Sequence, residues 1–313
     1  MQKKRLFTGL QPSGRLHIGN YFGALKQTVE MFEQNEGLVI IVDYHALTSL
    51  KDPHQLRSNI VEVLRDYVAV GLDPKKATLF QQSSVPEHTE LAWIFDCLVT
   101  VPFLMQAHAY KDKVAKGLEA NAGLFTYPML MAADILLYDT DIVPVGADQR
   151  QHVEYAREAA SKFNATFGET FKEPQEKILD SVAVVPGTDG QKMSKSYGNT
   201  IPLFGTKDEI AKAVMSIVTD SNAESPVNVY AIHALLRDRD YLSDLYKTNK
   251  GKYKVLKEAL VEDIEALVAP MRERRASITD EEVKAILKDG GEKARVLASR
   301  KMVEVRQKVG VSI

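Results

Sequence analysis

Two lysines, Lys192 and Lys195, stand three positions apart near the middle of the chain, in the string Lys-Met-Ser-Lys-Ser. Glycine and proline flank the string, which predicts a mobile cationic loop. Flexible ammonium groups can follow negative charge onto a leaving group, and serine hydroxyls and free backbone N–H groups can bind the same oxygens. Such a loop suits a polyphosphate, although a Lys-x-x-Lys turn alone also describes a solvated surface loop.

A second anion site is predicted near the start of the chain. An apolar strand at 6–10 is followed by a turn of Gln, Pro, Ser and Gly, and a helical pattern then runs over 17–34. The first N–H groups of a helix lack partners within the helix, and the helix dipole favours negative charge there. His17 and Asn20 share one helix face, and Gly19 leaves room for a planar base. Helix capping by His17 and simple packing at Gly19 are the alternatives.

Together the two motifs resemble the paired signatures of the class I aminoacyl-tRNA synthetases, the His-x-Gly-His type and the Lys-Met-Ser-Lys-Ser type, in the same order. Asn20 stands where the first signature often has its second His, and this departure is typical of the tryptophanyl and tyrosyl branch. The resemblance covers nearly the whole chain, but its specific motifs all precede Asn199. It implies catalytic roles for His17, Asn20, Lys192 and Lys195.

The resemblance also implies which residues contact ATP, the nucleotide substrate that would arrive with Mg²⁺. They lie in the N-terminal turn, the helix tip, the Gly-Ala-Asp-Gln string at 146–149, the strand before the lysine loop, and the loop itself: Gln11, Pro12, Ser13, Gly19, Asn20, Gly146, Ala147, Asp148, Val184, Lys192, Met193, Ser194, Lys195 and Ser196. For Asp148, capping of the following helix is an alternative role that is compatible with the first.

Asp134 interrupts an apolar string at 127–138. On a helix, Tyr127, Met131 and Asp134 lie at i, i+4 and i+7 and therefore share one face. The apolar neighbours predict that the carboxylate is buried, which costs several kcal/mol unless a donor satisfies it. That donor is either a protein backbone group or the N–H of a ligand. Indole suits the second reading, because its N–H can only donate and a carboxylate can only accept.

A tyrosine hydroxyl can also donate, so Asp134 alone leaves the substrate open. Tyrosyl members of the branch place Gln where this chain has Met131, whereas the string Tyr-Pro-x-Leu-Met-Ala-Ala-Asp-Ile-Leu resembles the bacterial tryptophanyl members. We therefore expect L-tryptophan, in a pocket that rejects rings without the matching donor. The residues expected around it are Asp134, Tyr127, Met131, Val143, Val145, Gln149, His45, Phe7 and Gly9.

Strand and helix patterns alternate along the first 199 residues. Strands are expected at 6–10, 38–43, 77–81, 141–145 and 177–185, and helices at 17–34, 53–70, 86–98 and 152–162. This order predicts an α/β fold with a doubly wound, Rossmann-like parallel sheet. Ligands of such sheets bind at the carboxyl ends of the strands, where His45 would lie. A lone His at a strand end is also a common structural residue.

Residues after 199 read as helices only, at 207–218, 227–236, 242–245, 252–270 and 280–313, with the pair Gly290-Gly291 expected to break the last one. We expect a nucleotide-binding catalytic domain at 1–199, a helical domain at 200–290 and a returning C-terminal helix at 291–313. The resemblance implies that 99–125 is a connecting insertion forming a homodimer interface, and that 200–290 binds the tRNA anticodon. Lys111 and Lys113 of the insertion either reach ATP or form a solvated face.

The composition excludes several classes of protein. A chain of 313 residues with 45% hydrophobic and 26% charged residues is typical of soluble globular proteins. No apolar run is long enough to cross a bilayer and no secretory signal follows the first basic residues, so we expect a cytoplasmic protein without membrane partners. The single cysteine, Cys97, excludes an internal disulfide and is expected to pack in the core. A net charge of −2 fits a protein that releases its nucleic acid quickly.

The expected reaction has two steps. The carboxylate of tryptophan attacks the α-phosphorus of Mg-ATP to give tryptophanyl-adenylate and pyrophosphate, and the terminal ribose of tRNA(Trp) then takes the tryptophanyl group and releases AMP. Three alternatives remain. Met131 disfavours a tyrosyl enzyme, a small-molecule nucleotidyltransferase would not need the helical region, and the intact lysines and His17 count against a non-catalytic tryptophan sensor or tRNA-binding paralogue.

Overall fold

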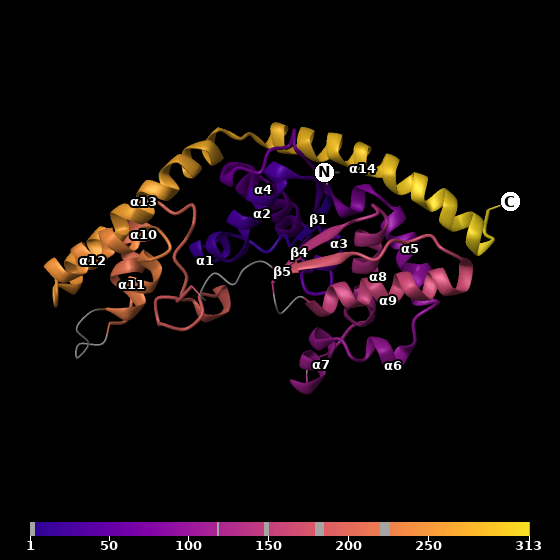
Figure 1. The fold of residues 1–313 in the computed structure, drawn as a ribbon, viewed down its shortest axis with the longest axis horizontal. Coiled ribbons are helices and arrows are strands. Elements are labelled where there is room, and N and C mark those ends of the chain that lie inside the picture. Colours follow the sequence, from indigo (N-terminus) through magenta and orange to yellow (C-terminus); the bar gives the residue numbers. More distant parts are fainter. Residues whose placement is uncertain (1–3, 118, 147–149, 179–184, 220–225, 313) are drawn as a thin grey trace.

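The structure is a computed structural model that describes residues 4–117, 119–146, 150–178, 185–219 and 226–312. Five strands form one sheet, in which every neighbouring pair is parallel and the order is β3-β2-β1-β4-β5 (Figure 1). The strands are β1 Arg5–Leu10, β2 Glu36–Ile41, β3 Ala77–Gln81, β4 Ile142–Val145 and β5 Gln175–Ile178. The chain builds outward from β1 to one side and then to the other, which confirms the predicted doubly wound sheet.

The helices before residue 199 belong mainly to the unit that contains the sheet. They are α1 Ile18–Asn20, a π-helical turn Tyr21–Leu25, α2 Lys26–Gln34, α3 Asp43–Ala46, α4 Pro53–Val70, α5 Glu87–Asp96, α6 Val101–Leu104, α7 His108–Ala115, α8 Ala122–Leu136 and α9 Arg150–Phe167, with 3₁₀ turns at Gln82–Ser84 and Lys195–Tyr197. The predicted helices at 17–34 and 53–70 are confirmed. The expected connecting insertion at 99–125 contains two short helices, α6 and α7.

Alternating strand residues fill two cores, one on each face of the sheet. Phe7, Ile40 and Phe80 pack with residues of α5, α8 and α9. Leu6 and Ile41 pack on the opposite face with residues of α2 and α4. Because successive side chains of a strand point to opposite faces, a continuous apolar run is what a sheet covered on both faces requires. Because helices cover both faces of the sheet, the carboxyl ends of its strands remain as the place for a site.

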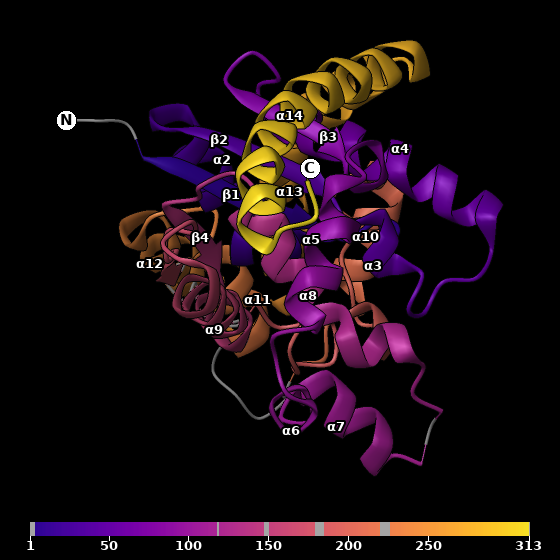
Figure 2. The same cartoon turned by 90° about the vertical axis from the view of Figure 1, so that its right-hand side faces the viewer.

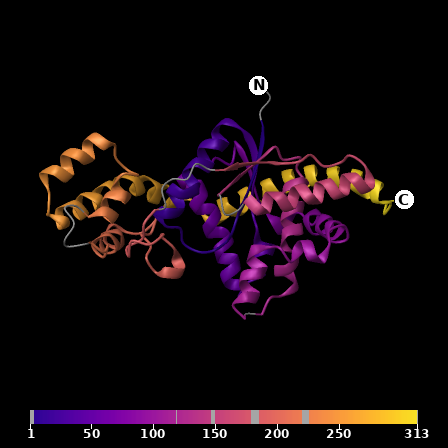
Figure 3. The same ribbon diagram turned by 60° about the horizontal axis from the view of Figure 1, so that its bottom comes forward.

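The later helices form an arm at one end of the molecule, seen at the left of Figure 1 and from other directions in Figures 2 and 3. They are α10 Lys207–Met215, α11 Val227–His233, α12 Arg239–Thr248 and α13 Tyr253–Ser277. Apolar residues of the arm share one buried cluster with Ile18, Tyr21 and Phe22 at the N-terminal helix tip. The α13 helix runs through Pro270, past the end expected from the sequence.

The expected break at Gly290-Gly291 is wrong, because α14 (Asp280–Val309) is one helix of 30 residues. It lies along the sheet-containing unit, across the top of Figure 1. A Cβ placed on Gly290 would come 1.8 Å from the Leu79 carbonyl oxygen, and one on Gly291 would come 2.7 Å from Ser84 Oγ. These glycines therefore let α14 touch the backbone of β3 rather than turn the chain. The return to the sheet begins at Asp280.

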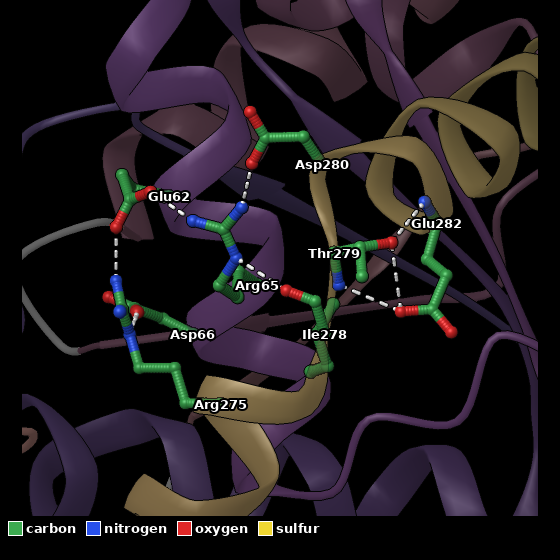
Figure 4. A network of polar contacts seen from close by, with 8 residues as sticks. All are labelled: Glu62, Arg65, Asp66, Arg275, Ile278, Thr279, Asp280 and Glu282. Atoms are coloured by element: carbon green, nitrogen blue, oxygen red, sulfur yellow. Dashed lines mark hydrogen bonds and ion pairs between the residues drawn. The ribbon is translucent and has the colours of Figure 1, made fainter.

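Where α13 ends and α14 begins, a polar network ties both helices to α4 (Figure 4). Arg65 of α4 donates to the Ile278 carbonyl oxygen at 3.1 Å and pairs with Asp280. Arg275 of α13 donates to Asp66 of α4 at 2.5 Å. The junction between the arm and the sheet-containing unit is thus held by charged side chains that face each other across three helices.

Two side chains in or next to α5 are exposed to solvent, and one of them was expected to be buried. Cys97, at the end of α5, is exposed, so its expected place in the core is wrong. Trp93 of the same helix is 69% exposed. Because both side chains project outward, the apolar face of α5 is carried by residues such as Leu91 and Phe95, which are buried. Among the described residues, no helix is long and apolar enough to span a membrane.

Candidate active site

A cavity of about 500 Å³ opens at the carboxyl ends of β1 and β4, beside α8. It collects residues from seven separate parts of the chain. Of the residues expected around tryptophan, those that line it are Phe7, Gly9, His45, Tyr127, Met131, Asp134, Val143 and Val145. Gln149 lies outside the described residues. Gln11 and Gly146, expected to contact ATP, line the same cavity.

The face of α8 that was expected to carry the pocket does so. Tyr127, Met131 and Asp134 all reach the cavity, and Val143 and Val145 of β4 add apolar surface to it. The Tyr127 hydroxyl lies 2.9 Å from His152 Nε2 of α9, and burial raises the pKa of Tyr127 to about 12. Tyr127 therefore presents a neutral, fixed ring. His152 has no motif around it and was not identified from the sequence.

Asp134 is buried, with 1% of its surface exposed, as predicted. Its donors are side chains, rather than the backbone group or the ligand N–H that were expected from the sequence. Gln82 Nε2 lies 2.8 and 2.9 Å from the two carboxylate oxygens, and His45 Nε2 lies 3.0 Å from Oδ2. His88 Nδ1 is 2.6 Å from Oδ1, an ion-pair distance whose angle is not that of a hydrogen bond. Burial by itself would raise the pKa of the Asp134 carboxyl, but His88 and His45 hold it below its usual range.

His17 begins the helix, and its backbone N–H donates to Asn20 Oδ1 at 3.1 Å. The amide oxygen of Asn20 thus caps the helix, which leaves the amide N–H groups of Asn20 as donors. Burial and the nearby Lys195 lower the pKa of His17 to about 4, so His17 is neutral near pH 7. A Cβ on Gly19 would come 3.2 Å from the Met193 Cβ. Both roles weighed for Gly19, space for a base and space for packing, remain compatible with this contact.

The lysine loop lies directly against the N-terminal turn. Lys195 Nζ donates to the carbonyl oxygens of Ser13 at 2.8 Å and Gly14 at 3.1 Å. Downstream of the loop, the Ile18 N–H donates to the Ile201 carbonyl oxygen and the Leu203 N–H donates to the Leu16 carbonyl oxygen, both at 3.0 Å. The loop and the helix tip, far apart in the sequence, are therefore one structural unit.

Asn199 organises the loop, and the sequence patterns did not identify it. It is 2% exposed. Its Oδ1 accepts from the Ser194 N–H at 2.8 Å, and its Nδ2 donates to Asp189 Oδ1 at 2.7 Å and to the Lys192 carbonyl oxygen at 3.1 Å. The amide side chain thus bridges both sides of the loop. This role could not be predicted from the sequence, because it depends on how the folded loop brings Asn199 next to Asp189, Lys192 and Ser194.

The remaining expected ATP contacts have mixed outcomes. Ser194 and Ser196 have hydroxyls 2.8 Å apart, and Met193 is buried beside the helix tip. The Pro12 carbonyl oxygen accepts from Asn59 at 2.9 Å. Lys192 is exposed. Ala147, Asp148 and Val184 lie outside the described residues.

Because Gln11 lines the cavity and Ser13 holds Lys195, the aromatic cavity and the cationic loop meet at one turn. A molecule that joins a ring, a carboxylate and a polyphosphate can therefore lie across both. In the part of the chain that the structure describes, no three His, Cys, Asp or Glu side chains are grouped to hold a metal ion.

Comparison with known proteins gives a consistent picture. Residues 1–288 match a family model described as "tRNA synthetases class I (W and Y)". The tryptophan–tRNA ligase of Fusobacterium nucleatum is 48% identical, over 98% of this chain and 98% of the relative, and that of Rhodopirellula baltica is 46% identical, over 98% and 99%. The crystal structure of tryptophanyl-tRNA synthetase from Campylobacter jejuni complexed with ADP and tryptophan has a TM-score of 0.92 and 44% identity, covering 98% of this chain and 99% of that one.

Proposed function

Since this chain belongs to the class I tRNA synthetases of the tryptophan and tyrosine group, we propose that its cavity and lysine loop together form the site of an ATP-dependent tryptophan–tRNA ligase. The enzyme joins L-tryptophan to tRNA(Trp) through tryptophanyl-adenylate and releases pyrophosphate and AMP. The observation that carries the proposal is the meeting of the two parts at the N-terminal turn, through Gln11 and Lys195.

The indole ring occupies the cavity between Met131 and Val143, with its N–H directed at Asp134. An ionised, buried carboxylate is a strong acceptor, and hydrogen bonds to charged groups contribute about 1.5–3 kcal/mol. The complex of Campylobacter jejuni with ADP and tryptophan supports a binding region that takes an adenine nucleotide and tryptophan in one molecule. The carboxylate of tryptophan then points to the N-terminal turn, where ATP lies.

The phosphates of ATP lie between the helix tip and the lysine loop. The neutral His17 and the amide of Asn20 donate to them from one side, and Lys192 and Lys195 approach from the other. Lys195 must leave Ser13 and Gly14 to do so. Mg²⁺ enters with ATP, held by the phosphates and water, a mode of binding that needs no cage of protein ligands. Gly146 and, from the resemblance, Ala147, Asp148 and Val184 contact the nucleoside.

Attack on the α-phosphorus places negative charge on the phosphoryl oxygens and on the departing pyrophosphate. Positioning and preorganised positive charge can supply most of the catalysis of phosphoryl transfer. Lys192 and Lys195 stabilise the pyrophosphate as it leaves, and His17 and Asn20 keep the α-phosphorus in line with the carboxylate. The adenylate is then attacked by the terminal ribose hydroxyl of tRNA(Trp).

Two measurements test the proposal. ATP–pyrophosphate exchange with each of the twenty amino acids should be fastest with tryptophan, whereas faster exchange with tyrosine would contradict tryptophan as the substrate.

Lys195→Ala should lower the rate of adenylate formation by about 10² to 10³ and leave tryptophan affinity unchanged, by analogy with removal of one preorganised donor. A loss of tryptophan affinity with an unchanged rate of adenylate formation would contradict the proposed role of Lys195 in stabilising the pyrophosphate.

We also propose that the arm, which consists of α10 to α13 within the expected region 200–290, binds the anticodon of tRNA(Trp). The arm projects from the sheet-containing unit and so can extend along a tRNA whose acceptor end enters the cavity (Figure 3). The test is the KM for tRNA of a variant with several lysines of the arm replaced. A rise in that KM, with amino-acid activation unchanged, is expected.

The insertion at 99–125 supplies the interface of a homodimer in this proposal. Val101 and Met105 near α6 and Val114 of α7 are large apolar side chains about half exposed. A partner subunit would remove them from water. Met105→Glu should therefore shift the protein to monomers in analytical ultracentrifugation. The cytoplasm is the proposed compartment, because ATP and tRNA are both found there.

A further inference from the structure

The donors behind Asp134 make up a layer that does not touch the cavity. Asp134 and His45 line the cavity, whereas Gln82 and His88, both fully buried, are absent from its lining. Gln82 and His88 contact the carboxylate from outside the cavity that would hold the proposed ligand. They therefore cannot contact tryptophan and can act only through Asp134.

The direction of the hydrogen bonds at Gln82 is fixed by the backbone. The Tyr44 N–H lies 3.1 Å from Gln82 Oε1, and a backbone N–H can only donate. The amide oxygen of Gln82 must face Tyr44, so its Nε2 group faces Asp134, 2.8 and 2.9 Å from the two oxygens. An amide N–H₂ that contacts both oxygens favours the carboxylate over the carboxylic acid.

The direction at His88 follows from the same reasoning. Two acceptors 2.6 Å apart would repel each other, so His88 Nδ1 carries a proton that attracts Asp134 Oδ1, although the angle is that of an ion-pair contact and not of a hydrogen bond. On the other edge of the ring, His88 Nε2 lies 2.8 Å from the Tyr138 hydroxyl, which anchors the imidazole. Phe80 stacks on the same ring, with centroids 6.1 Å apart. The imidazole thus has little freedom to turn away from the carboxylate.

We propose that Gln82 and His88 are positioning residues that keep Asp134 an ionised acceptor aimed into the cavity, and so set the preference for a ring that carries an N–H donor. The proposal rests on the proposed role of Asp134 toward indole. Donors from behind occupy both oxygens, so a proton on Asp134 would clash with them. Among the described residues that line the cavity, only His45 has a hydrogen bond to Oδ2, which it would share with a ligand.

The test compares two ligands that differ at one atom. L-Tryptophan has the indole N–H, and 3-(benzothiophen-3-yl)-L-alanine has sulfur in its place with nearly the same shape. KM and kcat for both are measured by ATP–pyrophosphate exchange on the full-length enzyme. The wild type should prefer tryptophan by about 10²-fold in kcat/KM, because the analogue leaves a buried charged acceptor without a donor.

Two independent variants remove the rear donors. Gln82→Met and His88→Leu, close in volume to the native side chains, should each reduce that preference about tenfold. The change should come from a higher KM for tryptophan, with KM for the analogue and kcat little altered. His88→Asn keeps an amide donor near the Nδ1 position and should restore most of the preference. If His88→Leu does not fold, Gln82→Met still decides the question.

A matched control separates positioning from packing. Phe80→Leu disturbs the ring packed on His88 but removes no donor from Asp134, so it should leave the ratio between the two ligands unchanged. An equal loss for both ligands in Gln82→Met and His88→Leu would overturn the inference. A wild-type enzyme that does not distinguish the two ligands would instead overturn the proposed contact between Asp134 and indole.

Discussion

Asp134 in α8 and Asp66 in α4 are both buried, and different kinds of side chain offset the cost of burying the two carboxylates. They are 1% and 3% exposed. Asp66 has a full cation beside it, Arg275, at 2.5 Å, yet burial dominates and its pKa is raised. Asp134 has amide and imidazole donors, and His88 and His45 lower its pKa in spite of stronger burial. Two imidazoles beside Asp134 thus overcome the effect of burial on its pKa, whereas Arg275 beside Asp66 does not.

The difference matches the position of each residue. Asp66 lies between α4 and α13, where its carboxylate joins the arm to the sheet-containing unit (Figure 4). Asp134 lies at the wall of the cavity, where His88 and His45, rather than a lysine or arginine, favour the charged form of its carboxylate. A structural carboxylate tolerates a raised pKa, whereas a recognition carboxylate needs a lowered pKa to stay charged.

The largest effect is expected from Asp134→Asn. The amide would turn an N–H₂ group toward Gln82 or His88, leaving buried donors without acceptors and removing the charge that attracts indole. KM for tryptophan should rise by about 10²-fold, and the free energy of unfolding should fall by about 3–5 kcal/mol. Pyrophosphate exchange and urea unfolding measure the two. Unchanged KM would show that Asp134 is as structural as Asp66.

Arg275→Leu should act on stability alone. It removes the cation from the buried Asp66, and loss of one partner of a buried pair costs about 3 kcal/mol, at the lower end because Arg275 is partly exposed. Tryptophan KM should stay within about twofold of the wild-type value, since neither Asp66 nor Arg275 lines the cavity that contains Asp134, although the neighbouring Tyr67 of α4 does. Urea unfolding and exchange kinetics on the same preparation check this. A large rise in KM would erase the distinction between the two carboxylates.

The cost of Arg275→Leu should depend on pH. Arg275 lowers the pKa of Asp66, so its removal raises that pKa further above the value in the unfolded chain. An acid with a raised folded pKa destabilises the protein above that pKa, and the cost fades as the pH falls through it. Destabilisation should therefore be smaller at pH 5 than at pH 8 in urea titrations. Equal losses at both would mean that the charge of Asp66 is not the cause.

The smallest effect is expected from a change of pH on the tryptophan affinity of the wild-type enzyme, which depends on the charge of Asp134. Because its pKa is below the usual carboxyl range, its contribution to stability is complete above that range and is lost only as the pH falls through the lowered value. Tryptophan affinity should change by less than about twofold between pH 6 and 8, as measured by calorimetry. The neutral His17, with a pKa of about 4, should add no ionisation in that window. A titration of affinity near pH 6 to 7 would contradict the assignment.

Much of the architecture follows from local patterns. The alternation of strand and helix patterns located β3 and α4 at their observed bounds, and the i, i+4, i+7 spacing placed Tyr127, Met131 and Asp134 on one side of α8. Gly290-Gly291 shows the limit of such patterns. A glycine pair breaks a helix in isolation, but here the helix continues because it packs on the β3 backbone.

The sequence by itself determined which chemistry the chain carries: paired lysines, a helix tip with His17 and Asn20, and one carboxylate among apolar residues. Only the tertiary structure decided that Gln82 and His88 hold that carboxylate, that Asn199 closes the lysine loop, and that Lys195 rests on Ser13 and Gly14. The physical reason is that motifs record short-range spacing, whereas hydrogen-bond partners are set by which distant segments the parallel sheet and its covering helices bring within 3 Å.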